Sequence, residues 1–334
     1  MIFLNGEKSM TRKDVVKRSI HFENPPYLPL MYYGAGRIEK SDAVMLGVQE
    51  MYGGADGRMT EWGFNWADTG MDFKLGVVKD PAITDWDQLD AYVPLDASRP
   101  GRFDEARKIM RQYPDKYYIA DFILSGFTIM SFVRGFENFM MDLVMEQDNV
   151  ERLADIVFGA EEDLIRACAK EGFDAICLAD DWGTQTSLLI SRQMICDIFM
   201  PRYKKQIELA HSLGLDVIMH CCGHIIDIIG DFIDTGLDAL NPGQPNLNGI
   251  EEMGKRFRGK LCFCCPIGYQ TTAIHGTVDD IYREVKSYVD NLATEKGGFM
   301  GFVASFNGIY SLGAPEENAK AVELAFEKYC GKRA

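Results

Sequence analysis

The chain has 334 residues, of which 47% are hydrophobic and 25% are charged, and this composition is typical of a soluble globular enzyme. Its formal net charge is −15, from 35 basic and 50 acidic residues, and no stripe of Lys or Arg suits nucleic acid or an anionic membrane surface. No apolar run reaches the roughly 18 residues of a membrane span, and the N-terminal region lacks the apolar segment of a secretion signal. We therefore expect a cytoplasmic protein that binds neither nucleic acid nor a membrane.

Short apolar runs alternate with helical segments along the chain. We predict them as strands, because each is too short for a helix and is rich in β-branched or aromatic residues. In chain order they are 27–33, a weaker run near 61–78, 117–124, and runs within 171–181, 213–222, 235–244, 260–265 and 297–306. About eight such units without a Pro/Ser linker predict one (β/α)8 barrel, a TIM barrel, over residues 1–334, with 1–25 as a helical extension.

Three helices have recognisable ends. Ser191 is a predicted N-cap for a helix over 191–213, and Thr277 is followed by a helix over 278–296 with acidic residues in its first turn. Pro315 suits the first turn of the last helix, which runs to about Cys330.

In a (β/α)8 barrel the active site lies at the C-terminal ends of the strands. The segments predicted there are 32–37, 180–182, 220–222, 241–244, 264–268 and 305–307. His220 and the two cysteine clusters of the chain therefore fall on this rim; the clusters are Cys221 with Cys222, and Cys262 with Cys264 and Cys265.

The stretch "VIMHCCGHI" (217–225) ends one of these strands. Side chains alternate along a strand, so His220 and Cys222 share one face, whereas Cys221 points the other way. One nitrogen and one sulfur suit a tetrahedral zinc ion, and a catalytic zinc needs a third protein ligand, which Cys264 or Cys265 of "CFCC" could supply. The alternatives are a core histidine beside a core cysteine, or a thiol nucleophile with His220 or His224 as its base.

Two further groups carry polar chemistry. Asp180 and Asp181 in "LADDWGTQ" point in opposite directions, so we expect one of them to face the cavity as a general acid/base or substrate-orienting carboxylate. Helix capping and loop hydrogen bonds are the alternative. Arg37 in "YGAGRIEK" is a candidate anion-binding residue, although the segment is not a phosphate loop.

Several motifs together resemble those of the uroporphyrinogen decarboxylase superfamily. They are "LMYYGAGR", "RGFENFMMDL", "ADDWGTQTSLLIS", "HSLGLDVIMHCCGHI", "GLDALNPGQ" and "APEENAKAVE", in the expected order from roughly residue 15 onward. The resemblance implies a TIM barrel. It also implies one of two activities, a cofactor-free decarboxylation or a zinc-dependent methyl transfer with a corrinoid protein.

The residues at individual motif positions favour methyl transfer over decarboxylation. Arg37 matches the second arginine of the decarboxylase motif, but Tyr33 replaces the first, and Asn307 stands where the decarboxylases carry a histidine. His220 and Cys222 match the first two zinc ligands of the methyltransferases. The third ligand of those enzymes falls near Asn307, so Cys264, Cys265 or an oxygen or nitrogen from another loop must complete the site.

The resemblance therefore implies a demethylase-type methyltransferase. It would use Zn²⁺ as a Lewis acid and move a methyl group between a small molecule and the cobalamin of a partner corrinoid protein. The small molecule would be a methoxyl or methyl donor, or a thiol- or folate-type acceptor. Asp180 or Asp181 would handle the proton, and the expected substrate-binding residues are Tyr32, Tyr33, Arg37, Trp182, Gln244 and Asn307. Superfamily members are often dimers, which makes a homodimer an expectation here too.

Overall fold

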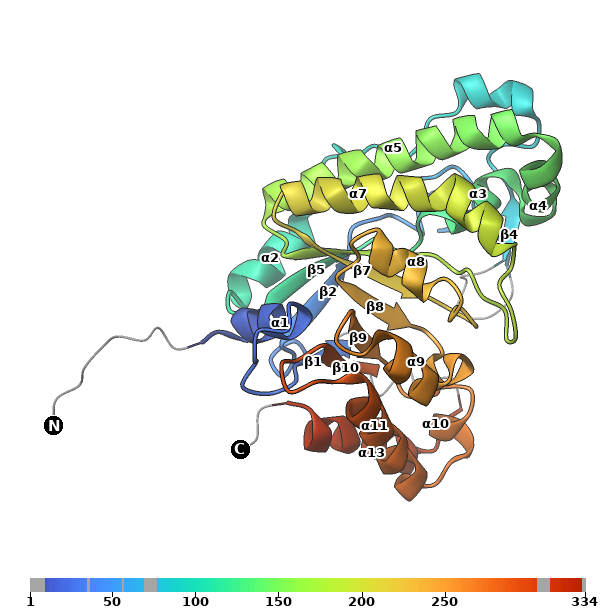
Figure 1. Ribbon diagram of the computed structural model, residues 1–334. Coiled ribbons are helices and arrows are strands. Elements are labelled where there is room, and N and C mark those ends of the chain that lie inside the picture. Colours follow the sequence, from blue (N-terminus) through green and yellow to red (C-terminus); the bar gives the residue numbers. More distant parts are fainter. Residues whose placement is uncertain (1–9, 35–36, 56, 69–76, 305–312, 332–334) are drawn as a thin grey trace, which may run out of the picture. The chain divides into compact units, whose positions relative to one another are not determined.

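The computed structural model describes residues 10–34, 37–55, 57–68, 77–304 and 313–331 (Figure 1). Asn307 of the predicted substrate-binding set lies outside these ranges. No helix in the described ranges is both long and apolar enough to cross a membrane.

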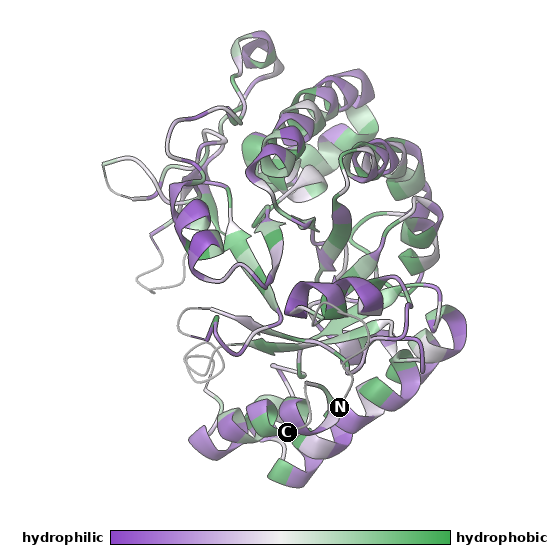
Figure 2. Ribbon diagram, turned by 90° about the vertical axis from the view of Figure 1, so that its left-hand side faces the viewer, coloured by the Kyte–Doolittle hydropathy of each residue, from purple (hydrophilic) through white to green (hydrophobic). Residues whose placement is uncertain are grey.

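Eight strands of the described chain form a closed parallel barrel, which confirms the predicted fold class. Their order around the barrel is β1-β10-β9-β8-β7-β6-β5-β2. The bounds are β1 (Leu30–Tyr33), β2 (Ala43–Gly47), β5 (Tyr117–Asp121), β6 (Ala175–Ala179), β7 (Asp216–Cys221), β8 (Ala239–Pro242), β9 (Cys262–Cys265) and β10 (Phe299–Ala304). Most of their residues are buried, as expected for a parallel sheet covered by helices, and Figure 2 shows the strands largely in the green of hydrophobic residues.

The second barrel strand differs from the prediction. The weak run near 61–78 is not a barrel strand, since its described ends belong to a separate antiparallel pair, β3 (Asn65–Trp66) and β4 (Val78–Asp80). The barrel instead uses β2, which pairs in parallel with β1 through Met31 and Ala43. Only turns and a bend fill the described residues 37–42 between these two strands, so the alternation of strand and helix that guided the prediction is absent here.

The helices of the described chain are α1 (Arg12–Ile20), α2 (Asp104–Gln112), α3 (Gly126–Arg134), α4 (Phe136–Met145), α5 (Gln147–Glu171), α6 (Arg192–Met194), α7 (Met200–Ser212), α8 (Ile229–Asp234), α9 (Ile250–Phe257), α10 (Thr272–His275), α11 (Val278–Leu292) and α13 (Glu316–Tyr329). Three of these helices, α7, α11 and α13, end close to the ends that the sequence predicts at 213, 296 and about Cys330. Ser191 caps α6 through the Met194 N–H at 3.2 Å, and a single π-helical turn, η2 (Ile195–Phe199), joins α6 to α7. Thr277 forms a capping box with Asp280 at the start of α11.

Contacts divide the chain into two compact units. Unit 1 comprises Met1–Met45, Ile109–Tyr118 and Asn241–Ala334, and in it α11 packs against α9 and α13. Unit 2 comprises Leu46–Lys108 and Ile119–Leu240, and in it α5 and α7 lie side by side (Figure 1). The assignment of residues 1–334 to a single domain stays a prediction.

Candidate metal centre

The loops that follow β6 and β7 continue the pairing of these two strands beyond their ends. The strand register runs to Ala179 opposite His220, and the Asp180 N–H then donates to the His220 carbonyl at 3.0 Å. The Gly183 N–H donates to the Cys222 carbonyl at 3.1 Å, which holds the two loops in register. Both loops belong to unit 2.

Two glycines allow this close approach. A Cβ at Gly223 would lie 2.2 Å from the carbonyl carbon and oxygen of Gly183, and a Cβ at Gly183 would lie 2.5 Å from the His224 nitrogen. Gly223 also has a φ of +84°, a conformation that favours glycine. The backbones therefore touch directly, and the His224 N–H donates to the Thr184 carbonyl at 2.8 Å just beyond the contact.

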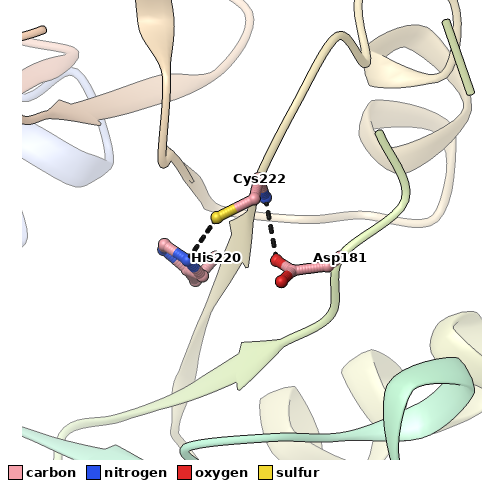
Figure 3. A group of neighbouring side chains, drawn as sticks. All are labelled: Asp181, His220 and Cys222. Atoms are coloured by element: carbon pink, nitrogen blue, oxygen red, sulfur yellow. Dashed lines mark hydrogen bonds between the residues drawn. The ribbon is translucent and has the colours of Figure 1, made fainter. Parts of the chain in front are cut away.

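Strand alternation separates the three residues at the end of β7. His220 and Cys222 are partly exposed on one face, and the Cys222 Sγ lies 3.4 Å from the His220 Nε2 (Figure 3). Cys221 is fully buried on the other face, where its Sγ accepts the Trp182 N–H at 3.4 Å. The histidine and only one of the two adjacent cysteines therefore share a surface.

Asp181 joins this pair from the neighbouring loop. Its Oδ1 accepts the Cys222 N–H at 3.1 Å, and the ligand atoms of Asp181, His220 and Cys222 all lie within 4.8 Å of one another (Figure 3). Burial, followed by the charge of Asp181, raises the pKa of the Cys222 thiol, a cost that a bound cation would offset. A carboxylate oxygen, an imidazole nitrogen and a thiol sulfur at this spacing fit the donor set of a zinc ion.

Asp180 points away from this group, toward the N-terminus of α3. It is fully buried, and its carboxylate accepts the Phe127 N–H at 2.8 Å, the Thr128 N–H at 2.8 Å and the Thr128 hydroxyl at 2.5 Å. The Tyr203 hydroxyl of α7 donates to it as well. Burial raises the pKa of Asp180 to about 7, and the hydrogen bonds from Thr128 and Tyr203 oppose this shift. These contacts favour a structural role over the predicted catalytic one.

A second buried carboxylate completes the start of α3. Glu161 of α5 accepts the Gly126 N–H at 2.8 Å and the Gln206 side-chain amide at 2.7 Å. Burial raises the pKa of Glu161 to about 8. The first N–H groups of α3, which no helical carbonyl can satisfy, are thus paired with the carboxyl oxygens of Glu161 and Asp180.

Trp182 is predicted to bind substrate, but it is fully buried beside the same helices. Its ring centroid lies 4.4 Å from that of Phe127 and 4.9 Å from that of Phe199. It packs in the layer between strand and helix, and this position favours a packing role.

The predicted third ligands lie in unit 1. Cys264 and Cys265 are fully buried in β9, the Cys264 carbonyl accepts the Asn241 side-chain amide at 2.5 Å, and burial raises the pKa of Cys265 well above its ordinary value. Within the part of the chain that the structure describes, neither cysteine belongs to the Asp181, His220 and Cys222 group. Asp181 is a candidate for the oxygen ligand from another loop that the sequence left open.

Four of the predicted substrate-binding residues also lie in unit 1. Tyr33 is 44% exposed and stacks on Phe302 with ring centroids 5.5 Å apart. Tyr32 donates its hydroxyl to Glu327 at 2.9 Å, and Arg37 forms an ion pair with Glu323. Gln244 is partly exposed before the short helix η3 (Pro245–Asn248). Their role in substrate binding stays a prediction.

Sequence reasoning missed three residues that shape this site. Thr128 gave no signal, because it looks like any helix residue, and only the fold brings it beside Asp180 and Asp181. Gly183 and Gly223 could have been noticed, since each closely follows the end of one of two neighbouring strands, β6 at Ala179 and β7 at Cys221.

Comparisons with known proteins agree with this architecture. A family model described as uroporphyrinogen decarboxylase (URO-D) matches residues 68–329. A search of curated proteins finds no match. Among solved structures, a methyltransferase from Methanosarcina mazei has a TM-score of 0.73 at 17% identity, with 96% of this chain and 99% of that chain covered. At this identity the likeness shows the fold.

Two further solved structures share less with the chain. Xylanase 10B from Thermotoga maritima has a TM-score of 0.46 at 8% identity, covering 95% of this chain and 98% of that chain. D-psicose 3-epimerase has a TM-score of 0.43 at 9% identity, covering 73% and 85%. Similarities this low carry no argument about function.

Proposed function

This chain belongs to the uroporphyrinogen decarboxylase family, and on that premise we propose that it is a zinc-dependent methyltransferase. The observation that carries the proposal is the group of Asp181, His220 and Cys222, whose ligand atoms lie within 4.8 Å of one another. A decarboxylase that works without a cofactor has no need of a thiol beside an imidazole and a carboxylate. The solved structure with the TM-score of 0.73 is a methyltransferase, which supports the same choice.

The proposed zinc ligands are His220, Cys222 and Asp181. Three protein ligands are the number found in catalytic zinc sites, which keep one position for water or substrate. Bound there, zinc would supply a Lewis acid for the atom that carries or accepts the methyl group. Cys222 would lose its proton on binding, while its backbone N–H continues to hold Asp181 at 3.1 Å.

The second methyl carrier in this proposal is the cobalamin of a partner corrinoid protein. The small molecule would be a methoxyl or methyl donor, or a thiol or folate acceptor. Tyr33, which is exposed and aromatic, and Arg37 remain the proposed contacts for this molecule.

Metal analysis and a methyl-transfer assay test the proposal together. Purified protein should hold about one zinc per chain. His220→Ala and Cys222→Ser should lose it, whereas Cys196→Ser, a partly exposed cysteine of η2, should keep it. The zinc-loaded protein should methylate cob(I)alamin from one of a panel of methoxylated and S-methyl compounds, followed by absorbance.

Two results would contradict this function. One is a zinc content near zero that the substitutions do not change. The other is release of CO₂ from a porphyrinogen by metal-free protein, which is the activity for which the family is named.

A further inference from the structure

We propose that Thr128 is a positioning residue that fixes Asp181 as a metal ligand, and this inference rests on the proposed function. Thr128 lies in the first turn of α3 and is 5% exposed. It touches none of the reacting groups in the proposal. Its hydroxyl, however, connects Asp181 to the buried carboxylate of Asp180.

The direction of the hydrogen bonds at this hydroxyl is determined. Thr128 Oγ1 donates to Asp180 Oδ1 at 2.5 Å and accepts the Asp181 N–H at 3.0 Å. A hydroxyl has a single proton. Because Asp180 takes that proton, a lone pair of the oxygen is left for the Asp181 N–H.

Asp180 is a fixed anchor for this chain of hydrogen bonds. The N–H groups of Phe127 and Thr128 each donate to it at 2.8 Å, and the Tyr203 hydroxyl donates from α7. Any movement of Asp180 would leave buried donors without their acceptor, which is costly. Thr128 therefore transmits the position of a rigid helix terminus to the loop after β6.

As a result, both the backbone and the side-chain carboxylate of Asp181 are held by hydrogen bonds. Its N–H is bound by Thr128, and its Oδ1 accepts the Cys222 N–H at 3.1 Å. Since groups that orient metal ligands typically contribute about 10- to 100-fold to metal affinity, we expect an effect of this size from the Thr128 hydroxyl.

Three variants at and near this position test the role. Thr128→Val keeps the β-branched shape but removes the hydroxyl, and Thr128→Ser keeps the hydroxyl. Ser131→Ala is the matched control, because Ser131 is a buried hydroxyl of the same helix that donates to the Thr128 carbonyl at 2.8 Å.

Zinc affinity is measured by competition with a chromophoric chelator, and ligand geometry by the visible absorption of Co²⁺-loaded protein. Thr128→Val should bind zinc about 10- to 100-fold more weakly and change the Co²⁺ bands, whereas Thr128→Ser and Ser131→Ala should stay within about 3-fold of the unmodified protein. In an Asp181→Asn background, Thr128→Val should have no further effect, because the group it positions is gone.

Each outcome decides something. Unchanged zinc affinity and Co²⁺ bands in Thr128→Val overturn the positioning role, and an equal loss in Ser131→Ala reduces it to a general effect of helix stability. If Thr128→Val does not fold, Thr128→Ala removes the same hydroxyl with less bulk and gives the same decision. If the unmodified protein binds no metal, the proposed function itself fails, and this is a different result from the other two.

Discussion

Asp180 and Asp181 are identical side chains on consecutive residues, yet they lie in opposite environments. Asp180 is enclosed in the layer between strand and helix, where it accepts four hydrogen bonds. Asp181 is partly exposed, and its carboxylate accepts the Cys222 N–H. The first is therefore tied to folding, and the second is available for chemistry.

Removing each charge in turn should separate these roles. In metal-free protein, Asp180→Asn should lower the free energy of unfolding by roughly 1–3 kcal/mol, because an amide presents an NH₂ group to donors that need an acceptor. Asp181→Asn should change it by about 0.5 kcal/mol or less. Urea denaturation of chelator-treated protein gives both values. Equal losses of stability would contradict the division.

The same residues show what the sequence can predict at this scale. Strand alternation correctly places His220 with Cys222 and Cys221 on the other face. It also predicts that a single aspartate faces the cavity, but not which one. That depends on where β6 ends and on the N–H groups of Phe127 and Thr128, which lie 53 and 52 positions earlier in the chain. Nothing in the local sequence reports that contact.

At the scale of elements, the site depends on two loops pressed together through Gly183 and Gly223. Gly223→Ala would place a Cβ 2.2 Å from the Gly183 carbonyl group in a backbone conformation that disfavours alanine. The loops must then separate, which moves Asp181 away from Cys222. We expect Gly223→Ala to lower zinc affinity at least 10-fold and to lower the melting temperature.

Gly159 is the control for this substitution. It lies within α5, and a Cβ there would meet nothing within 4 Å. Gly159→Ala should leave zinc affinity unchanged and stabilise the protein by up to about 1 kcal/mol, because alanine favours the helix. The two variants are compared by chelator competition and thermal melting. Normal zinc binding in Gly223→Ala would show that the glycine contact does not maintain the site.

Element prediction succeeded where strand and helix alternate and failed where they do not. The strands of β6 to β10 follow helices that end at a glycine or close to one, and each was predicted within a few residues. β2 follows β1 without a helix in the described residues, so the alternation of strand and helix gives no signal for β2. The run near 61–78 is therefore predicted as the second barrel strand instead. The barrel tolerates this departure because β2 still pairs in parallel with β1.

At the scale of the whole molecule, the stability of the fold depends on pH, because a carboxyl group in its interior is neutral. Glu161 is fully buried, and burial raises its pKa from 4.5 to about 8. The groups facing it are Asp180, whose charge acts in the same direction, and Gln206 and Gly126, whose hydrogen bonds oppose it. At neutral pH the folded chain therefore holds a proton at Glu161 that the unfolded chain releases.

The sign of the pH dependence follows from this difference. The contribution of Glu161 to stability is fully present below about pH 4.5 and is lost as the pH rises through about 8, because deprotonation then costs the folded state alone. Glu161→Gln keeps an acceptor for the Gly126 N–H but cannot ionise. Between pH 5 and 9 the unmodified protein should therefore lose about 2–4 kcal/mol more stability than Glu161→Gln.

Urea denaturation of both proteins across this pH range measures the difference, because titrating groups that do not interact with Glu161 are shared and cancel in the comparison. Glu137→Gln, which removes an exposed carboxylate of α4, should reproduce the curve of the unmodified protein. Parallel curves for the unmodified protein and Glu161→Gln would mean that Glu161 is ionised in the folded state. The start of α3, to which Asp181 is linked through Thr128, would then face an ionised Glu161 beside Asp180 instead of a neutral one.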